Sequence, residues 1–180
     1  MTADRRRPRE PLRGERTSVR RADAADAELL VRWHRDPDVA RFWDGETYSL
    51  EEMRERLARE DVDPYVVEAD GQPVGYLQAW FDGDACGLDM FLVPEARGRG
   101  LGPDAAHALA RYLLDEGGWT RVTVDPYVWN EAAIRAWERA GFRPVEEREP
   151  DEEHPHRWLL MELRRRPPAS AAGAGTAPAP

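Results

Sequence analysis

Hydrophobic positions change their period along the chain, and each change marks a different kind of predicted element. Between residues 24 and 60, apolar residues recur every three or four positions, which is the period of an amphipathic helix. The predicted helices cover 24–35, 39–43 and 50–60. Between residues 65 and 93, apolar runs are separated by short turns, which is typical of strands. The predicted strands cover 65–69, 74–81 and 87–93, and Asp70-Gly71 predicts a hairpin between the first two.

The stretch from Gly87 to Gly117 contains the most informative pattern. The strand at 87–93 is too continuously apolar to be half-exposed, so we predict a buried one; its apolar residues are Leu88, Met90, Phe91, Leu92 and Val93. Arg97-Gly-Arg-Gly-Leu-Gly102 follows as a glycine-rich turn, and a helix is expected to begin near Pro103. Backbone N–H groups at such a turn meet the positive end of the helix dipole, which favours a phosphate-bearing ligand. The alternative is a tight turn whose glycines serve geometry alone.

The second half of the chain alternates between strands and helices. Asn130 is expected to cap a helix that Gly141 ends. The remaining predicted strands cover 17–20, 121–125, 142–147 and 157–163. This order predicts a single α/β domain in which helices pack on the faces of a mixed sheet.

The two ends of the chain lack apolar periodicity. Residues 1–16 are rich in Arg and Pro and residues 166–180 in Ala and Pro, so both are expected to be disordered around a domain at 17–165. No apolar run reaches the roughly 20 residues that cross a membrane, and no apolar signal segment follows the first arginines. Cys86 is the only cysteine, which excludes an internal disulfide and fits a reducing compartment. We therefore expect a cytoplasmic protein without a membrane partner.

Charge is unevenly distributed, and lysine is absent. Eight Arg and three acidic residues within residues 1–21 give +5, so the rest of the chain carries −14 of the total of −9. An acidic body disfavours nucleic acid as a partner and favours cationic substrates. The absence of lysine excludes a lysine Schiff base and a P-loop lysine. Pro103 stands where the third glycine of a dinucleotide-binding fingerprint belongs, and His154 and His156 lack metal-ligand spacing.

Two signatures carry a resemblance to a known superfamily. Arg97–Gly102 has the form R-x-x-G-x-G, and Asn130–Phe142 has the form N-x-x-A-I-x-x-(Y/F)-x-x-x-G-F except at one position. In this order and spacing they resemble the GNAT superfamily of acetyl-CoA-dependent N-acetyltransferases, over residues 17–165. The resemblance implies the GNAT fold, a mixed, mostly antiparallel central sheet with helices on both faces. It also implies acetyl-CoA as co-substrate and no metal.

The resemblance implies cofactor-binding roles for particular residues. Backbone groups of Phe91, Leu92 and Val93 are expected to pair with the pantetheine arm. Asn130 is expected to hydrogen-bond that arm with Ala133 nearby, and its alternative role is only to cap the helix. The expected pyrophosphate-binding residues are Arg97, Gly98, Arg99, Gly100, Leu101 and Gly102.

Within the superfamily, the chain looks most like aminoglycoside 6′-N-acetyltransferases. The matching pieces are Gly87–Met90, Thr123–Pro126, Asn130–Arg135 and Arg139–Phe142. This resemblance implies acetyl transfer to the 6′-amine of a polycation, an antibiotic-resistance activity, and the charge of −14 suits such a substrate.

Two aspartates are the expected catalytic and amine-binding carboxylates. Asp89 and Asp125 are predicted on neighbouring central strands, where both would lie beside the thioester. Asp89 stands in an otherwise apolar strand, and an unpaired buried carboxylate costs several kcal/mol. We therefore expect Asp89 to take a proton from the amine, and the alternative is pairing with an Arg or a turn.

Position 137 departs from the second signature. The usual proton donor there is a Tyr, whereas this chain has Trp137, whose indole N–H donates a hydrogen bond but delivers no proton. The sequence leaves the acid step open between Tyr127, solvent, and stabilisation of the thiolate without an acid. Core packing is the alternative role of Trp137.

Further substrate contacts are expected from the helical lead-in and from the loop before the central strand. A solvated surface position is the alternative for each of them. The candidates are Trp43, Asp44, Glu46, Asp82 and Asp84.

Three other functions fit the same signatures. The segments Val124–Asn130 and His156–Met161 also resemble acyltransferases for hydroxylysine-type or lysine-type amines in siderophore assembly. Acetylation of a protein N-terminus is a second alternative, and a non-catalytic acetyl-CoA-binding sensor is a third. The sequence leaves both a monomer and a homodimer open.

Overall fold

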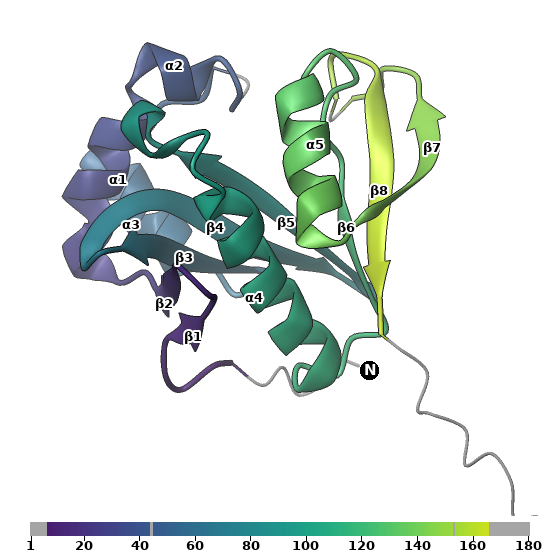
Figure 1. The fold of residues 1–180 in the computed structure, drawn as a ribbon. Coiled ribbons are helices and arrows are strands. Elements are labelled where there is room, and N and C mark those ends of the chain that lie inside the picture. The colour runs from purple at the N-terminus through teal and green to yellow at the C-terminus, as the bar shows by residue number, and fades with distance from the viewer. Residues whose placement is uncertain (1–6, 44, 153, 166–180) are drawn as a thin grey trace, which may run out of the picture.

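Eight strands form one mixed sheet within residues 7–43, 45–152 and 154–165, which the computed structural model describes (Figure 1). The strand order is β1-β2-β3-β4-β5-β6-β8-β7, and every neighbouring pair is antiparallel except β5 and β6. The strands are β1 (Leu12–Arg13), β2 (Ser18–Arg21), β3 (Val62–Ala69), β4 (Gln72–Asp82), β5 (Ala85–Leu92), β6 (Arg121–Val124), β7 (Arg143–Arg148) and β8 (Trp158–Arg164). The predicted α/β architecture, with a mixed and mostly antiparallel central sheet, is confirmed.

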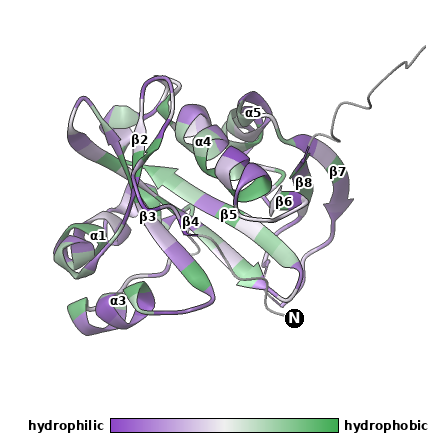
Figure 2. Cartoon of the chain, turned by 90° about the horizontal axis from the view of Figure 1, so that it is seen from below, coloured by the Kyte–Doolittle hydropathy of each residue, from purple (hydrophilic) through white to green (hydrophobic). Residues whose placement is uncertain are grey.

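Helices cover both faces of the sheet, with α1 and α3 on one side and α4 and α5 on the other (Figure 2). The helices are α1 (Ala27–His34), α2 (Pro37–Ala40), α3 (Leu50–Leu57), α4 (Leu101–Asp115) and α5 (Glu131–Ala140), with short 3-10 turns at Ala24–Asp26 and Pro94–Ala96. None of the helices in the described ranges is both long enough and apolar enough to cross a membrane.

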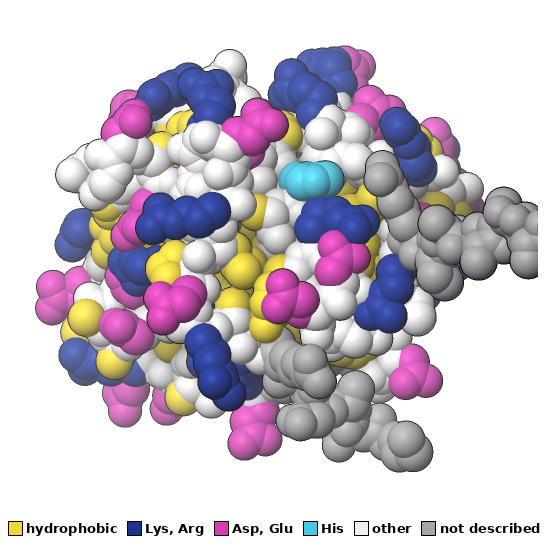
Figure 3. Space-filling model, turned by 60° about the horizontal axis from the view of Figure 1, so that its bottom comes forward, with side chains coloured by type: hydrophobic (Ala, Val, Ile, Leu, Met, Phe, Trp, Pro, Cys, Tyr) yellow, Lys and Arg dark blue, Asp and Glu magenta, His cyan; other side chains and the backbone are white. Residues whose placement is uncertain are grey.

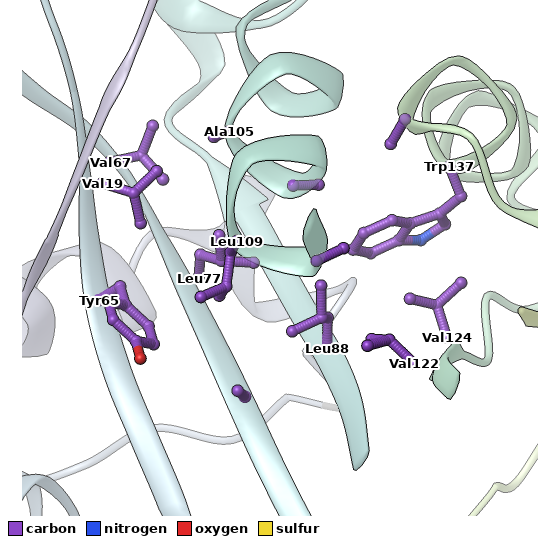
Figure 4. Close-up of a cluster of buried hydrophobic side chains, with 14 of the residues drawn as sticks. Val19, Tyr65, Val67, Leu77, Leu88, Ala105, Leu109, Val122, Val124 and Trp137 are labelled. Carbon is purple, nitrogen blue, oxygen red and sulfur yellow. The ribbon is translucent and has the colours of Figure 1, made fainter. Parts of the chain in front are cut away.

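Alternating strand residues give each face its own hydrophobic core. Leu77 and Leu88 pack with α4 and α5 in one core, which Figure 4 shows around Leu109 and Trp137. Tyr76 and Phe91 point the other way and pack in a second core against α1 and α3. The buried strand predicted at 87–93 is therefore apolar on both faces because both faces are covered.

Local capping explains where the helices start. Ser49 Oγ accepts a hydrogen bond from the Glu52 N–H, and the Glu52 carboxylate accepts one from the Ser49 N–H, a capping box that begins α3. Asn130 Oδ1 accepts from the Ala133 N–H at 3.2 Å and begins α5. Gly141 ends α5 with φ of 105°, in the left-handed region that glycine adopts without strain.

The N-terminal segment differs from the expectation. Residues 12–16 were assigned to a disordered arm, but β1 pairs with β2 and Leu12 packs against the core. Asp104, in the first turn of α4, accepts hydrogen bonds from Glu15 N at 2.8 Å, Arg16 N at 3.0 Å and Thr17 Oγ1 at 2.6 Å. That expectation was wrong because a two-residue strand has no readable period. Residues 1–6 and the predicted tail at 166–180 lie outside the described residues.

Strands β5 and β6 run parallel but separate along their length. A single register pair, Gly87 with Thr123, joins them. β6 ends one residue later at Val124, whereas β5 continues to Leu92. The two strands lie together near the lower right of Figure 1 and diverge upward. The edge of β5 that faces β6 is consequently open beyond Leu88.

Candidate active site

A cavity of about 290 Å³ lies where β5 and β6 diverge. Its wall combines three acidic side chains, one arginine and one histidine with aromatic groups. The lining residues are Phe42, Trp43, Glu46, Arg56, Gln78, Leu88, Asp89, Met90, Asp125, Pro126, Tyr127, Asn130, Ala133, Trp137 and His154. Asp89 and Asp125, predicted from different strands, meet in this cavity.

Asp89 has a fixed hydrogen-bond donor. Gln78 Nε2 donates to Asp89 Oδ2 at 2.6 Å. The Tyr76 hydroxyl, at 3.0 Å, and Arg56 Nη2, at 3.2 Å, both donate to Gln78 Oε1. Because its oxygen is occupied by two donors, the Gln78 amide presents its N–H to Asp89.

The environment of Asp89 favours its protonated form more than water does. Burial is the largest cause and the negative charge of Asp125 the second, and together they raise the pKa of Asp89 to about 7. The Gln78 hydrogen bond and the charges of Arg56 and His154 oppose that shift. A carboxylate with this pKa takes up and releases a proton near neutral pH.

His154 is a site residue that the sequence analysis missed. Its Nε2 lies 3.2 Å from Asp125 Oδ2 and its Nδ1 lies 2.9 Å from Asp151 Oδ1. Its ring stacks on Trp158, with centroids 4.4 Å apart. The hydrogen bond with Asp125, followed by that with Asp151, raises the pKa of His154 to about 9. The sequence carries no local signal for this role, because Asp125 lies 29 positions away from His154.

Trp137 lies in the core and at the wall of the cavity. It is 6% exposed, and its ring points toward Leu88, Val122 and Val124 (Figure 4). It also meets Phe142 edge to face, with centroids 5.4 Å apart. The indole cannot release a proton in the working pH range, so Trp137 packs the site.

Tyr127, the other candidate for the acid step, also lines the cavity. Its ring stacks on Trp129 with centroids 5.7 Å apart and meets the edge of His156 at 5.3 Å. Its assignment to proton transfer stays a prediction.

The expected substrate contacts divide into two groups. Trp43 and Glu46 line the cavity, whereas Asp44 lies outside the described residues. Asp82 and Asp84 lie at the turn between β4 and β5, and neither lines the cavity. Asp84 is five residues before Asp89, about 17 Å along an extended strand. The structure therefore does not support a contact of Asp84 with a substrate amine inside this cavity.

The glycine-rich turn leads into α4, as predicted. The first turn of α4 has no side-chain cap, so its backbone N–H groups are available to an anion. Gly98 and Gly100 have φ of 72° and 78°, which a glycine adopts without strain. Gly100 begins α4, and no side chain caps the N–H groups there. Leu101 is buried, and a Cβ on Gly102 would lie 3.1 Å from Met90 Cε, so both residues also set the packing of α4 on β5.

The two arginines of the turn have different surroundings. Arg97 donates to Leu92 O at 2.9 Å and to Asp38 O at 3.0 Å, which ties the turn to β5 and α2. Arg99 is half-exposed and lies 3.5 Å from Asp70. Arg16, assigned to the arm by the sequence, donates to the Arg99 carbonyl. Arg97 thus has a structural role beside the charge expected of it.

The charge on the visible surface is mixed, and the described residues contain no cluster of metal ligands. Arg and acidic side chains are interspersed on the face shown in Figure 3, so the net charge of −9 does not form one patch there. No group of three potential metal ligands occurs among the residues that the structure describes.

Comparison with known proteins supports a family assignment. A family model described as an acetyltransferase (GNAT) domain matches residues 23–149. Aminoglycoside N(6′)-acetyltransferase type 1 from Klebsiella pneumoniae is 30% identical over 138 residues, covering 65% of this chain and 69% of that protein. The protein of the same name from Serratia marcescens gives the same values.

Solved structures share the fold. AAC(6')-Ib in complex with ribostamycin and coenzyme A aligns with a TM-score of 0.74 and 26% identity, covering 84% of this chain and 94% of that one. Spermidine N-acetyltransferase from Vibrio cholerae, in complex with CoA and spermine, aligns with a TM-score of 0.74 and is 15% identical, which shows the fold alone. The chain therefore belongs to the GNAT superfamily that its two signatures resemble, and it is an acetyl-CoA-dependent N-acetyltransferase.

Proposed function

We propose that the chain acetylates a primary amine of a cationic small molecule, with an aminoglycoside 6′-amine as the first candidate. One observation carries this proposal: Asp89, with a pKa of about 7, lies beside Asp125 in a cavity at the divergence of β5 and β6. Two carboxylates attract an ammonium group, and a carboxylate of this pKa accepts its proton. The 30% identity to aminoglycoside N(6′)-acetyltransferases supports the substrate class.

The open edge of β5 fits the cofactor. We place the pantetheine amides along this edge, where β6 no longer pairs with β5, at Phe91, Leu92 and Val93. The N–H groups from Gly98 to Gly102 at the uncapped start of α4 suit the pyrophosphate. Asn130 and Ala133 line the cavity that contains Asp89, where we propose that they contact the pantetheine arm. Bound there, acetyl-CoA supplies the acetyl thioester.

Asp89 is the proton acceptor in the proposed mechanism. An alkylammonium holds its proton to roughly pH 9–10, and only the neutral amine attacks a carbonyl. Asp89 takes that proton, directly or through one water, while the charge of Asp125 helps to hold the ammonium before transfer. A backbone N–H on β5 beyond Asp89 stabilises the oxygen on which negative charge develops. The amine nitrogen gains the acetyl group and the carbon–sulfur bond breaks.

The proton for the leaving thiolate comes from solvent. Trp137 replaces the tyrosine of the signature and supplies no proton. An alkyl thiol has a pKa of roughly 8.5, so a thiolate that reaches water is protonated at neutral pH without an enzyme acid.

A thiol-release assay with acetyl-CoA and a panel of amines tests the proposal. The panel contains kanamycin, ribostamycin, spermidine, lysine, and a peptide with a free N-terminus. We expect turnover of the aminoglycosides with the highest kcat/KM, and acetylation at the 6′-nitrogen by mass spectrometry and NMR. Acetyl-CoA binding without turnover of any amine would indicate a sensor instead, and preference for the peptide would indicate N-terminal acetylation.

Arg56 favours a second candidate, an amine that also carries a carboxylate. Its guanidinium lines the cavity, contacts the Tyr48 ring at 5.1 Å, and makes no ion pair among the described residues. Gln78 bridges Arg56 to Asp89, so an anion and an amine would bind within roughly 8 Å of each other. Lysine-type or hydroxylysine-type acceptors have this spacing of charges. A higher kcat/KM for lysine or N6-hydroxylysine than for any aminoglycoside would establish this function.

A further inference from the structure

The loop between β7 and β8 contacts Asp125 through His154, and both ring nitrogens of His154 contact carboxylates. Nε2 lies 3.2 Å from Asp125 Oδ2, and Nδ1 lies 2.9 Å from Asp151 Oδ1. A carboxylate that carries a charge can only accept, so both nitrogens act as donors when both carboxylates are ionised. The ring that satisfies both contacts is the imidazolium.

The loop is built to hold this ring in place. The His154 backbone N–H donates to Asp151 Oδ1 at 2.7 Å, and Trp158 Nε1 donates to Asp151 Oδ2 at 3.3 Å. Trp158 stacks beneath the imidazole, and the Arg148 guanidinium lies 5.2 Å from the Trp158 ring centroid. The ring is therefore oriented from three directions before any substrate arrives.

The contact between His154 and Asp125 decides which of the two neighbouring carboxylates, Asp89 or Asp125, is protonated first. Asp89 and Asp125 repel each other when both are ionised, so one of the two gains a proton first. His154 pairs with Asp125, whereas the side-chain hydrogen bond that Asp89 accepts within the described residues comes from the neutral donor Gln78. The proton consequently goes to Asp89.

We propose that His154 is a positioning residue that keeps Asp125 anionic and thereby assigns the proton-acceptor role to Asp89. The proposal rests on the proposed function, because it concerns which carboxylate serves the acetyl transfer. His154 is not placed in contact with the reacting atoms. It acts through Asp125, and the raised pKa of His154 agrees with a cation at that position.

Other charged groups around this pair set the background for its titration. Arg56 of α3 faces Asp89 through Gln78, and Glu46 lines the cavity ahead of α3. Tyr127 lines the cavity after β6, and Asp151 faces His154 from its own loop. These groups are unchanged in a His154 variant, so a change in the pKa of Asp89 in that variant reports on the loss of the imidazolium.

Ring-nitrogen NMR of 15N-histidine protein tests the charge of His154 without any substrate. The protein has 4 histidines, and His154→Gln identifies the resonance. We expect His154 to remain doubly protonated at pH 8 and to titrate near 9. In Asp125→Asn, the pKa of His154 should fall most of the way back to its ordinary value. Titration of His154 at the same pH as His156, or no response to Asp125→Asn, would overturn the proposal.

The pH dependence of kcat/KM tests the effect on Asp89. In His154→Gln we expect the acidic limb to move to higher pH by about 0.5–1 unit, because Asp89 loses the nearby cation. His154→Arg retains a positive charge and should keep the limb near its original position. His156→Gln is the matched control, since His156 lies in the same loop and contacts Tyr127 and Trp129 rather than Asp125.

The outcomes separate this proposal from the proposed function. If kcat falls in His154→Gln while the acidic limb of the pH profile does not move, the proposed acetyl-transfer function still holds. His154 would then have a structural role only. Absence of turnover in the wild-type protein, together with the expected NMR titration, would reject the proposed function and retain the His154–Asp125 pair.

Discussion

Gln78 and Asp89 lie directly opposite each other on β4 and β5, and Gln78 Nε2 donates to Asp89 Oδ2 at 2.6 Å. The sheet register thus delivers one neutral donor to the carboxylate. The Gln78 hydrogen bond favours the ionised form, while burial and Asp125 favour the protonated form. The balance of these opposing effects keeps Asp89 available as a base near neutral pH.

Asp89→Asn tests the role of that carboxylate. The amide cannot accept the ammonium proton, so we expect kcat/KM to fall by roughly 10²–10⁴-fold. Affinity for acetyl-CoA, measured by calorimetry, should change little. Asp84→Asn is the control, because Asp84 is exposed and lies outside the cavity. A near-wild-type rate for Asp89→Asn would remove the assignment of Asp89 as base.

The wild-type pH profile provides a second prediction. Asp89 accepts a proton only when it is ionised, and its pKa is about 7. We therefore expect kcat/KM to rise with pH through about 7 and to level off above it. An ordinary aspartate would place this limb near pH 4. A profile that is flat between pH 5.5 and 8 would contradict the raised pKa.

Gly100→Val tests the cofactor turn. Gly100 has φ of 78° at the uncapped start of α4, so a branched side chain strains the backbone and also enters the space proposed for the pyrophosphate. We expect the Kd for coenzyme A to rise at least about tenfold, or roughly 1.4 kcal/mol. Gly118→Val separates the two effects, because Gly118 has φ of 85° and lies after α4. Equal Kd values for Gly100→Val and wild type would reject this turn as the pyrophosphate site.

Arg56→Gln distinguishes the two candidate substrates. If the acceptor carries a carboxylate, loss of the guanidinium should raise its KM roughly tenfold while kcat changes less. For a polycationic aminoglycoside, removal of a positive charge should leave KM unchanged or lower it. Arg54→Gln on the exposed side of α3 is the control. A rise in KM for aminoglycosides alone would contradict both expectations.

Asp104→Ala tests how the N-terminal segment is fastened. Asp104 accepts three hydrogen bonds from residues 15–17, so we expect the free energy of unfolding to fall by roughly 1–2 kcal/mol. Burial acts to raise the pKa of Asp104, but the hydrogen bonds from Thr17, Arg16 and Glu15 lower it on balance. This stabilisation should therefore be present above about pH 4 and be lost as the pH falls further. Asp115→Ala, on the same helix, removes only an exposed pair with Arg111.

Sequence patterns were sufficient for the parts of the fold that depend on local rules. The apolar run before Arg97, the cap at Asn130 and the stop at Gly141 each reflect a backbone requirement that few residue types meet. The pairing of Asp89 and Asp125 was also predictable, because it follows from two strands being neighbours in a recognised fold.

Other features of the site arise from contacts between distant segments. His154 meets Asp125 across 29 positions, and Arg56 meets Gln78 across 22 positions. No periodicity encodes such contacts. Asp84 is the opposite case: its position in the chain is close to Asp89, but a strand separates the two by about 17 Å, and Asp84 does not line the cavity.

The contact between Asp104 and residues 15–17 has a consequence for how the chain folds. These partners are 87 to 89 positions apart, so the contact closes a loop that contains the whole first half of the domain. Closing a loop of that length costs entropy that local contacts must first offset. The edge strand β1 and its neighbour β2 are synthesised early, yet their contact with α4 can form only after α4 has been made. We therefore expect the first strands synthesised to be among the last to gain protection from hydrogen exchange during refolding.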